Sequence, residues 1–269
     1  MTKSSAYLGH LDEETGREQL LRDHLTGVAD LAGRFAAPFG EEAVGQLLGL
    51  YHDIGKYSRE FQEYLRADET EKKRHRGRID HSTAGAQEIV KLGQGTGQGK
   101  SSRLSKGMAH VMAFCIAGHH GGIPNQGTSA NTEEEGTLLG RLKRRNLPDY
   151  RAYHEAKLED VLPASRLLEE VARAPFSTML YTRMLFSCLV DADFLDTEDF
   201  MAAGKAGREG FASLDTLLER LQKSLEENFL KPKTEKEKQK RQLPINEKRS
   251  ALLAQSIAAG KEAKGNLYR

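Results

Sequence analysis

The chain has 269 residues, of which 38% are hydrophobic and 29% charged, and its formal net charge is +1. This composition is typical of a soluble, helix-rich protein that buries a substantial core, and a net charge so close to zero argues neither for nor against a nucleic-acid partner. Two cysteines exclude a four-cysteine zinc site, and the lack of any apolar run of about 20 residues argues against a membrane-spanning helix.

The N-terminal sequence Met-Thr-Lys-Ser-Ser is not followed by the apolar segment of a secretory signal peptide. Cys115 and Cys188 each lie inside an apolar stretch, which favours buried thiols over a disulfide and fits a reducing compartment. We therefore expect a cytoplasmic protein with no membrane partner.

Apolar residues recur at helical spacing along most of the chain. In residues 16–37 the apolar residues recur at steps of three or four, as an amphipathic helix requires; they are Leu20, Leu21, Leu25, Val28, Leu31 and Phe35. We expect further helices at 41–51, 58–66, 108–117, 158–171, 178–194, 213–229 and 246–259, and one that starts at 81–82. Because no alternating strand pattern of any length is present, we predict an all-α fold.

Polar segments separate the predicted helices. Residues 93–106 and 125–150 are interpreted as loops or insertions. The glycine-rich run inside the first is one residue short of a phosphate-binding loop, and no strand pattern precedes it. The run 231–241 contains six basic and two acidic residues and is typical of a solvated linker. We expect one domain over 1–230, followed by a basic linker and a helix over 231–269.

Histidines and aspartates gather at the ends or on the faces of the predicted helices. Seven of them combine imidazole and carboxylate ligands: His24, His52, Asp53, His81, His119, His120 and Asp193. Such ligands suit Mn, Fe, Co, Ni or Zn better than Ca or Mg. They exceed what one ion needs, so a helical bundle that brings them together would form a two-metal centre, with ions about 3.5–4 Å apart and an activated water that attacks phosphorus.

The order and spacing of these residues resemble a known family. His24 on a helix, His52-Asp53 with Gly55-Lys56, His81-Ser82, His119-His120 and the late Ala-Asp-x-Leu at 192–195 are similar to the HD phosphohydrolase superfamily. More narrowly, they resemble the HD nuclease domain of the CRISPR-associated helicase-nuclease of type I systems. The resemblance covers roughly residues 7–200.

The resemblance implies an HD-domain helical bundle with two divalent transition-metal ions, of which Mn, Ni, Co and Fe are expected first and Mg is also accepted. One ion would be held by His24, His52, Asp53 and Asp193, and the other by Asp53, His81, His119 and His120. Asp53 would bridge the ions, and Lys56 would face the phosphate and neutralise charge there.

Asp191 competes with Asp193 for a place in this set. Two residues apart on a helix, they point about 200° from each other and cannot easily bind the same ion. We predict Asp193, because the Ala-Asp-x-Leu context matches the family.

The implied activity is metal-dependent endo- or exonucleolytic hydrolysis of single-stranded DNA during type I CRISPR interference. The implied partners are a helicase domain in the same or a partner chain, a crRNA-guided surveillance complex and a phage inhibitor. Residues 245–256 resemble the helix just before the first nucleotide-binding motif. We therefore expect residues 231–269 to lead towards a helicase domain absent from this chain.

Two other functions compete with the nuclease. An HD-type nucleotide phosphohydrolase would use the same ligands, but the His-His pair and the helicase-like tail argue against it. A metal-holding docking module for a surveillance complex or inhibitor would need no catalysis, but all ligand types are present. At single residues, Lys56 has the alternative role of a cation at a helix C-terminus, and His24 that of a structural histidine.

Overall fold

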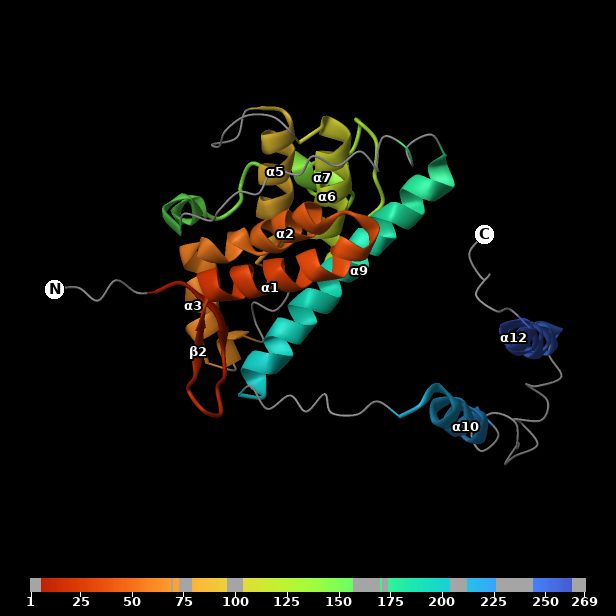
Figure 1. The fold of residues 1–269 in the computed structure, drawn as a ribbon. Helices are drawn as coiled ribbons and strands as arrows, with labels where there is room; N and C mark the ends of the chain where they lie inside the picture. The colour runs from red at the N-terminus through yellow and green to blue at the C-terminus, as the bar shows by residue number, and fades with distance from the viewer. Residues whose placement is uncertain are drawn as a thin grey trace. The chain divides into compact units, whose positions relative to one another are not determined.

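A computed structural model describes residues 6–68, 70–72, 79–95, 104–156, 170, 174–203, 212–225 and 244–262. Its elements are β1 (Leu8–Leu11), β2 (Glu18–Leu20), α1 (Leu21–Ala36), η1 (Ala37–Phe39), α2 (Glu42–Tyr51), η2 (Ile54–Tyr57), α3 (Arg59–Arg66), α5 (Ser82–Gly93), α6 (Lys106–Gly118), α7 (Leu138–Leu142), η3 (Arg151–Ala156), α9 (Pro175–Met201), α10 (Leu214–Leu225) and α12 (Pro244–Glu262). Helices dominate this order (Figure 1), which confirms the prediction of an all-α fold.

One small sheet was not predicted. β1 and β2 pair antiparallel, with Leu8 opposite Leu20. Strands of four and three residues are too short to show an alternating pattern in the sequence. Gln62 of α3 ties the hairpin to the helices, because its side chain accepts from Leu8 N at 2.9 Å and donates to Leu8 O at 2.9 Å.

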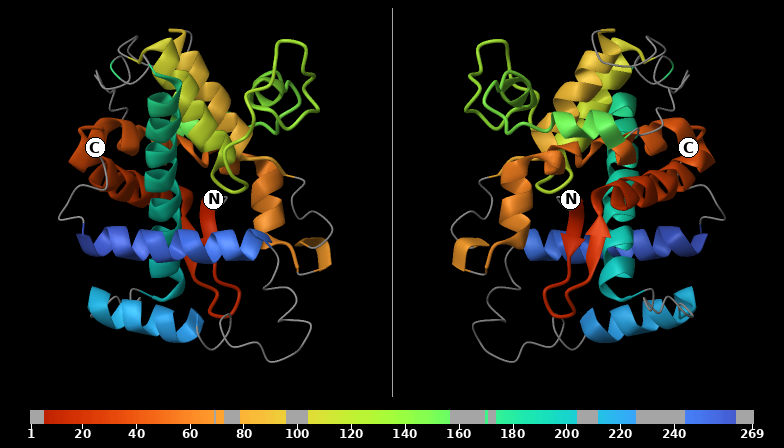
Figure 2. Two further views of the ribbon diagram at one scale, coloured as in Figure 1. Left: turned by 90° about the vertical axis from the view of Figure 1, so that its right-hand side faces the viewer. Right: turned by 90° about the vertical axis from the view of Figure 1, so that its left-hand side faces the viewer.

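Five of the described helices pack together to form the fold: α1, α2, α5, α6 and α9. α1 packs along α2, α5 packs along α6, and α9 contacts α1 and α6 (Figures 1 and 2). A Cβ on Gly49 of α2 would lie 2.4 Å from the Ala29 Cα of α1, so only glycine allows this close approach. The ends of α2 and α6, which carry predicted ligands, are therefore held by rigid packing.

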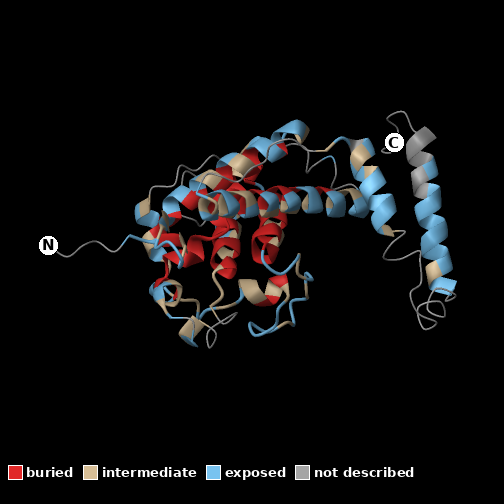
Figure 3. Cartoon of the chain, turned by 90° about the horizontal axis from the view of Figure 1, so that it is seen from below, coloured by how far each residue is buried: buried red, intermediate tan, exposed pale blue. Residues whose placement is uncertain are grey.

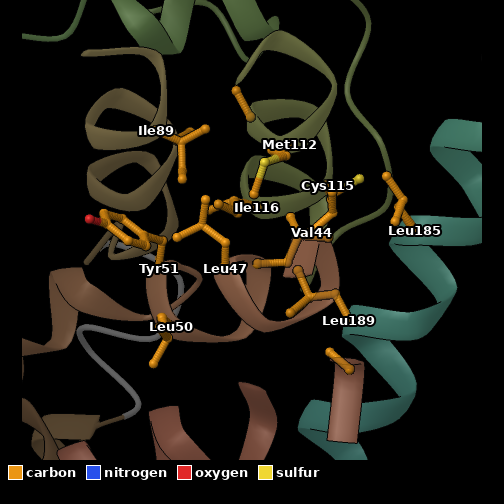
Figure 4. Close-up of a cluster of buried hydrophobic side chains, with 14 of the residues drawn as sticks. Val44, Leu47, Leu50, Tyr51, Ile89, Met112, Cys115, Ile116, Leu185 and Leu189 are labelled. Atoms are coloured by element: carbon orange, nitrogen blue, oxygen red, sulfur yellow. The ribbon is translucent and has the colours of Figure 1, made fainter. Parts of the chain in front are cut away.

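The core lies between α2, α5, α6 and α9. Side chains of Leu47, Ile89, Ile116 and Leu189, one from each of these helices, meet there with no exposed surface (Figure 4). Burying such side chains contributes about 1.5–3 kcal/mol each, so this region supplies much of the stability that fixes the helix ends.

The segment 125–150 differs from the expected loop. It contains α7, whose first turn is capped by the Thr137 hydroxyl accepting from Gly140 N at 3.1 Å. Leu138 in that turn is fully buried in the core. A five-residue helix is too short to show an apolar period, which is why the sequence pattern did not indicate it.

Some predicted segments lie outside the described residues. They are the run 231–241, residues 96–103 of the predicted loop 93–106, residues 226–229 of the helix 213–229, and the helix 158–171 apart from residue 170. At the edges of the loop 93–106, α5 ends at Gly93 and α6 begins at Lys106.

The chain divides into two compact units, Met1–Ala206 and Gly207–Arg269, whereas the sequence placed a boundary at 230/231. Buried residues gather in the helices of the first unit, and the described side chains of α10 and α12 are largely exposed (Figure 3). Leu217 and Leu221 of α10 are among the exposed apolar side chains. None of the described helices combines the length and the apolar content that a membrane crossing requires.

Candidate metal centre

The seven predicted ligand residues come from separate elements and meet in one place. His24 lies on α1, and His52 and Asp53 lie in the turn from α2 into η2. His81 lies at the start of α5, His119 and His120 lie at the end of α6, and Asp193 lies on α9. Their ligand atoms form two groups, within each of which all atoms lie within 4.8 Å of one another. Group 1 is His24, His52, Asp53 and Asp193; group 2 is Asp53, His81, His119 and His120.

Asp53 is shared because each of its carboxylate oxygens faces a different group. Oδ2 lies 3.5 Å from His24 Nε2 and 3.4 Å from His52 Nε2. Oδ1 lies 3.4 Å from His81 Nε2 and 3.3 Å from His119 Nε2. These separations exceed those of strong hydrogen bonds. They suit atoms that surround a common ion, since ligands about 2.0–2.2 Å from one ion lie roughly 3 Å or more apart.

Three imidazoles are oriented through Nδ1, which leaves Nε2 pointing into the centre. His52 Nδ1 lies 2.8 Å from Gly49 O, and His119 Nδ1 lies 2.7 Å from Ile116 O. Both acceptors are carbonyls three residues earlier, near the end of a helix, where backbone acceptors have no helical partner. His24 Nδ1 lies 2.7 Å from the carboxylate oxygen Oδ2 of Asp196. Such contacts to the second nitrogen fix the ring orientation of metal-binding histidines.

The centre contains five buried polar atoms that form no hydrogen bond with any residue the structure describes. They are Nε2 of His24, His52 and His119 and both carboxylate oxygens of Asp53. Leaving a buried polar atom unpaired costs about 1–3 kcal/mol. A divalent cation in each group would satisfy these atoms at once, so the residues present fit two metal ions.

His81 and His120 complete group 2 from the exposed side. Their Nε2 atoms lie 2.7 Å apart, a distance at which two lone pairs repel unless a proton or a cation lies between them. Burial lowers the pKa of His81 to about 3 and that of His120 to about 4. Both rings are therefore neutral at pH 7 and present lone pairs, as metal ligands must.

The two carboxylates stay ionised although they are buried. Burial opposes ionisation of Asp53, but the charges of Lys56 and His52 outweigh it and hold its pKa well below the ordinary value. Burial likewise opposes ionisation of Asp193, and the neighbouring imidazole of His52 lowers its pKa. For His52, burial favours the neutral ring, but Asp53 and Asp193 raise its pKa to about 10. A cation entering group 1 therefore has to displace a proton from His52.

Lys56 is buried beside the shared carboxylate. Its Nζ lies 2.7 Å from Asp53 Oδ2, without hydrogen-bond geometry, and donates to Gly9 O at 3.3 Å. It lies in η2, after the end of α2. That it faces a substrate phosphate stays a prediction.

The structure separates the two candidate aspartates on α9. Asp193 is mostly buried, and its Oδ1 lies 3.4 Å from His24 Nε2 and 3.7 Å from His52 Nε2. Asp191 is exposed and belongs to neither ligand group. The rotation of about 200° expected between them on a helix accounts for this difference, and the geometry favours Asp193 as the ligand.

Asp196 was not singled out from the sequence. It lies three residues after Asp193, so it shares that face of α9, and its Oδ2 is the atom 2.7 Å from His24 Nδ1. Gln19 of β2 donates to the same oxygen at 2.8 Å. The helical spacing was a signal for Asp196, whereas nothing in the sequence around Gln19 indicated its contact.

A hollow of about 430 Å³ borders group 2 at His120. Gly121, Gly122 and Gly136 line it, and a Cβ on any of the three would meet no atom within 4 Å. Small residues therefore leave room for a ligand beside the ligand atoms of group 2. A larger hollow of about 670 Å³, between α5 and residues 144–154, contains no member of either group.

A known protein family matches the segment that contains most of the predicted ligands. A family model described as "Cas3, HD domain" matches residues 11–190, which is more than half of the chain. The chain belongs to the Cas3 HD-domain family. Its match includes every predicted metal ligand except Asp193, whose assignment rests on the geometry of α9. No curated protein matches the chain.

Membership in the Cas3 HD family confirms the resemblance seen in the sequence and the HD-domain fold. It implies a metal-dependent nuclease or phosphohydrolase that belongs to a CRISPR context. HD domains bind divalent metal ions, and the two ligand groups provide places for them.

Proposed function

We propose that this Cas3 HD domain is a nuclease that hydrolyses phosphodiester bonds of single-stranded DNA during type I CRISPR interference. The observation that supports it best is the shared carboxylate of Asp53, each oxygen of which faces the ligand atoms of a different group. Two adjoining cation sites are the arrangement that phosphodiester hydrolysis uses to stabilise the attacking and leaving oxygens.

Groups 1 and 2 would each hold a divalent transition-metal ion, with Mn, Ni, Co or Fe suiting imidazole and carboxylate best and Mg also accepted. Such ions, when bound, lower the pKa of water and neutralise charge on phosphate. Asp53 holds the two groups together, and the Nδ1 contacts of His24, His52 and His119 prevent their rings from turning away. Lys56 adds a buried positive charge that opposes the negative charge of the scissile group.

The hollow at His120 favours a strand over a mononucleotide. A small ligand normally has 70–90% of its surface buried in its pocket. Here the glycines 121, 122 and 136 line the hollow, and a Cβ on any of them would meet no atom within 4 Å, so these positions enclose a ligand poorly. A strand can continue past such a site in both directions, whereas a mononucleotide would be poorly enclosed.

We further propose that the domain acts in the cytoplasm beside a helicase domain of the same or a partner chain, which feeds it DNA exposed by a crRNA-guided surveillance complex. A phage inhibitor that covers the hollow would block it. The domain division at 1–230 and 231–269 remains part of this proposal, with the second segment leading towards the helicase.

The deciding experiment supplies Mn²⁺ or Ni²⁺ to metal-stripped protein and offers circular single-stranded DNA and, separately, a set of mononucleotides and cyclic nucleotides. We expect nicked and then shortened DNA, with the nucleotides intact. Hydrolysis of a nucleotide while the DNA stays intact would instead identify a nucleotide phosphohydrolase. Bound metal with neither substrate hydrolysed would identify a docking module.

A further inference from the structure

Arg141 of α7 connects the two segments that carry His81 and His120 of group 2. Its Nη2 donates to Asp80 Oδ1 at 3.0 Å and to Ser82 Oγ at 2.7 Å, and its Nε donates to Thr83 Oγ1 at 2.8 Å. Its Nη1 donates to Ala117 O. One planar guanidinium thus joins the start of α5 to the last turn of α6.

These acceptors surround the ligands in the chain. Asp80 and Ser82 flank His81, and Ala117 lies three residues before His120. The distance of 2.7 Å between His81 Nε2 and His120 Nε2 depends on how these two chain segments are placed. Arg141 is the side chain that bonds to both of them at this point.

His81 and His120 need such support because their own rings are weakly anchored. His81 Nδ1 lies 3.4 Å from Ile79 O, a long contact, and no hydrogen bond of His120 Nδ1 is found within the described part of the chain. His52 and His119, by contrast, have short contacts to a carbonyl of their own helix. The placement of His81 and His120 therefore relies on the backbone that carries them.

Asp80 is held from several directions, which makes it a firm anchor for Arg141. Its Oδ1 accepts from Thr83 N at 3.0 Å, so it caps the start of α5, and Arg144 pairs with its other oxygen. The side chains of Arg141 and Asp80 are only 14% and 24% exposed. A charge-assisted pair this shielded from water is stronger than a surface pair.

We propose that Arg141 is a positioning residue that keeps His81 and His120 in place for the ion of group 2, without affecting the ion of group 1. This inference rests on the proposed two-metal function. The rings of group 1 have separate supports, since His24 contacts Asp196 and His52 contacts Gly49 O. None of the hydrogen bonds that Arg141 forms with the described residues reaches any of these residues.

The test measures binding of Mn²⁺ alone to the metal-stripped full chain by calorimetry, with electron paramagnetic resonance to count the ions. We expect two ions in the wild type. In Arg141→Gln, one binding step should weaken by about 10- to 100-fold, the usual effect of losing an outer contact of a metal ligand, and the other step should be unchanged.

Double variants identify the step that is lost. Arg141→Gln added to His120→Ala should cause little further loss, because both changes affect group 2. Added to Asp196→Asn, which affects group 1, it should weaken the remaining step as well. A large further loss of affinity in the double variant with His120→Ala, together with no further loss in the one with Asp196→Asn, would overturn the proposal.

Lys143, the residue directly after the end of α7, provides a matched control. Its Nζ donates to Ser129 O at 2.7 Å and Asn131 O at 2.6 Å, and neither of these acceptors belongs to a segment that carries a ligand. Lys143→Gln removes the same charge and should leave both binding steps intact. Arg141→Lys, which keeps the charge but has a single nitrogen, should restore only part of the lost affinity.

Several results would overturn the proposal. They are two Mn²⁺ ions bound by Arg141→Gln with wild-type affinity, equal weakening of both steps, or the same weakening in Lys143→Gln. If Arg141→Gln does not fold, Asp80→Asn is measured in its place. One binding step should weaken in this variant too, and two ions bound with wild-type affinity would overturn the proposal. A wild type that binds fewer than two ions overturns the metal centre as well. Two ions without DNA cleavage contradict only the nuclease.

Discussion

Lys56 shows how one buried cation can act against metal binding and for catalysis. Its Nζ lies 2.7 Å from Asp53 Oδ2, the oxygen that faces group 1. A positive charge there repels an incoming cation, yet it also opposes negative charge that develops on a phosphate. Removing the charge of Lys56 is therefore expected to strengthen metal binding but to slow hydrolysis.

We predict that Lys56→Gln binds Mn²⁺ at least as tightly as the wild type and hydrolyses single-stranded DNA about 10²-fold more slowly. Calorimetry gives the affinity, and cleavage at saturating Mn²⁺ gives the rate. Arg59→Gln is the control, because Arg59 is 86% exposed and pairs with Glu63 in the same part of the chain, so neither quantity should change. Weaker Mn²⁺ binding by Lys56→Gln would mean that Lys56 serves to orient Asp53.

At the scale of elements, a buried carboxylate joins α5 to the residues around η3. Glu88 accepts from the hydroxyls of Tyr150 and Tyr153, each at 2.9 Å, and from Lys91 Nζ at 2.7 Å. Burial opposes ionisation of Glu88, but the hydrogen bonds from Lys91, Tyr153 and Tyr150 outweigh it and lower its pKa below 4.5. The ionised form is therefore stabilised by the fold.

A lowered pKa in the folded state means that Glu88 contributes stability above pH 4.5 and loses it as the pH falls through the folded value. We predict that Glu88→Gln lowers the free energy of unfolding by about 1–3 kcal/mol at pH 7. The gap between wild type and variant should shrink as the pH falls below 4.5. Urea denaturation over this pH range measures both.

Glu60→Gln on α3 is the control for this pH dependence, because Glu60 is exposed and its substitution should stay within about 0.5 kcal/mol of the wild type. A gap between wild type and Glu88→Gln that is the same at every pH would show that shape rather than charge holds the tyrosines.

At the scale of the whole molecule, the ligands and the described core lie within the first compact unit. All seven predicted ligands fall between His24 and Asp193, inside the unit Met1–Ala206. A unit with its own core is expected to fold independently. The second unit, as far as it is described, exposes leucines of α10 and contributes no ligand.

We predict that a fragment of residues 1–206 unfolds cooperatively with a Tm within a few degrees of the full chain and binds the same number of Mn²⁺ ions. Thermal unfolding with circular dichroism and Mn²⁺ titration provide the measurements. A fragment of residues 1–230, which ends where the sequence placed a boundary, should behave alike. Loss of folding or of an ion in the shorter fragment only would show that residues 207–230 belong to the first unit.

The sequence by itself determined most of the long helices and the ligand types, but neither α7 nor the strand β2 at the start of the helix expected over 16–37. Apolar steps of three and four residues predict α1, because burial selects one face of a helix. Leu21, Leu25 and Val28 are fully buried, whereas Leu20 and Phe35, which follow the same pattern, are exposed. Ligand chemistry is a property of the side chain itself, so His52-Asp53 indicates a metal before any fold is known. Helical rotation also separated Asp193 from Asp191, because the angle per residue is a local quantity.

Tertiary structure alone decided which groups support the ligands. The contact of His24 with Asp196 spans 172 residues, and that of Arg141 with Asp80 spans 61. No local period encodes such pairs, because they form only when packing of α1, α2, α5, α6 and α9 brings distant segments together. The same packing turns the two oxygens of Asp53 towards different groups. The residues that would bind metal are thus visible in the sequence, whereas the contacts that hold them in place depend on how the helices pack.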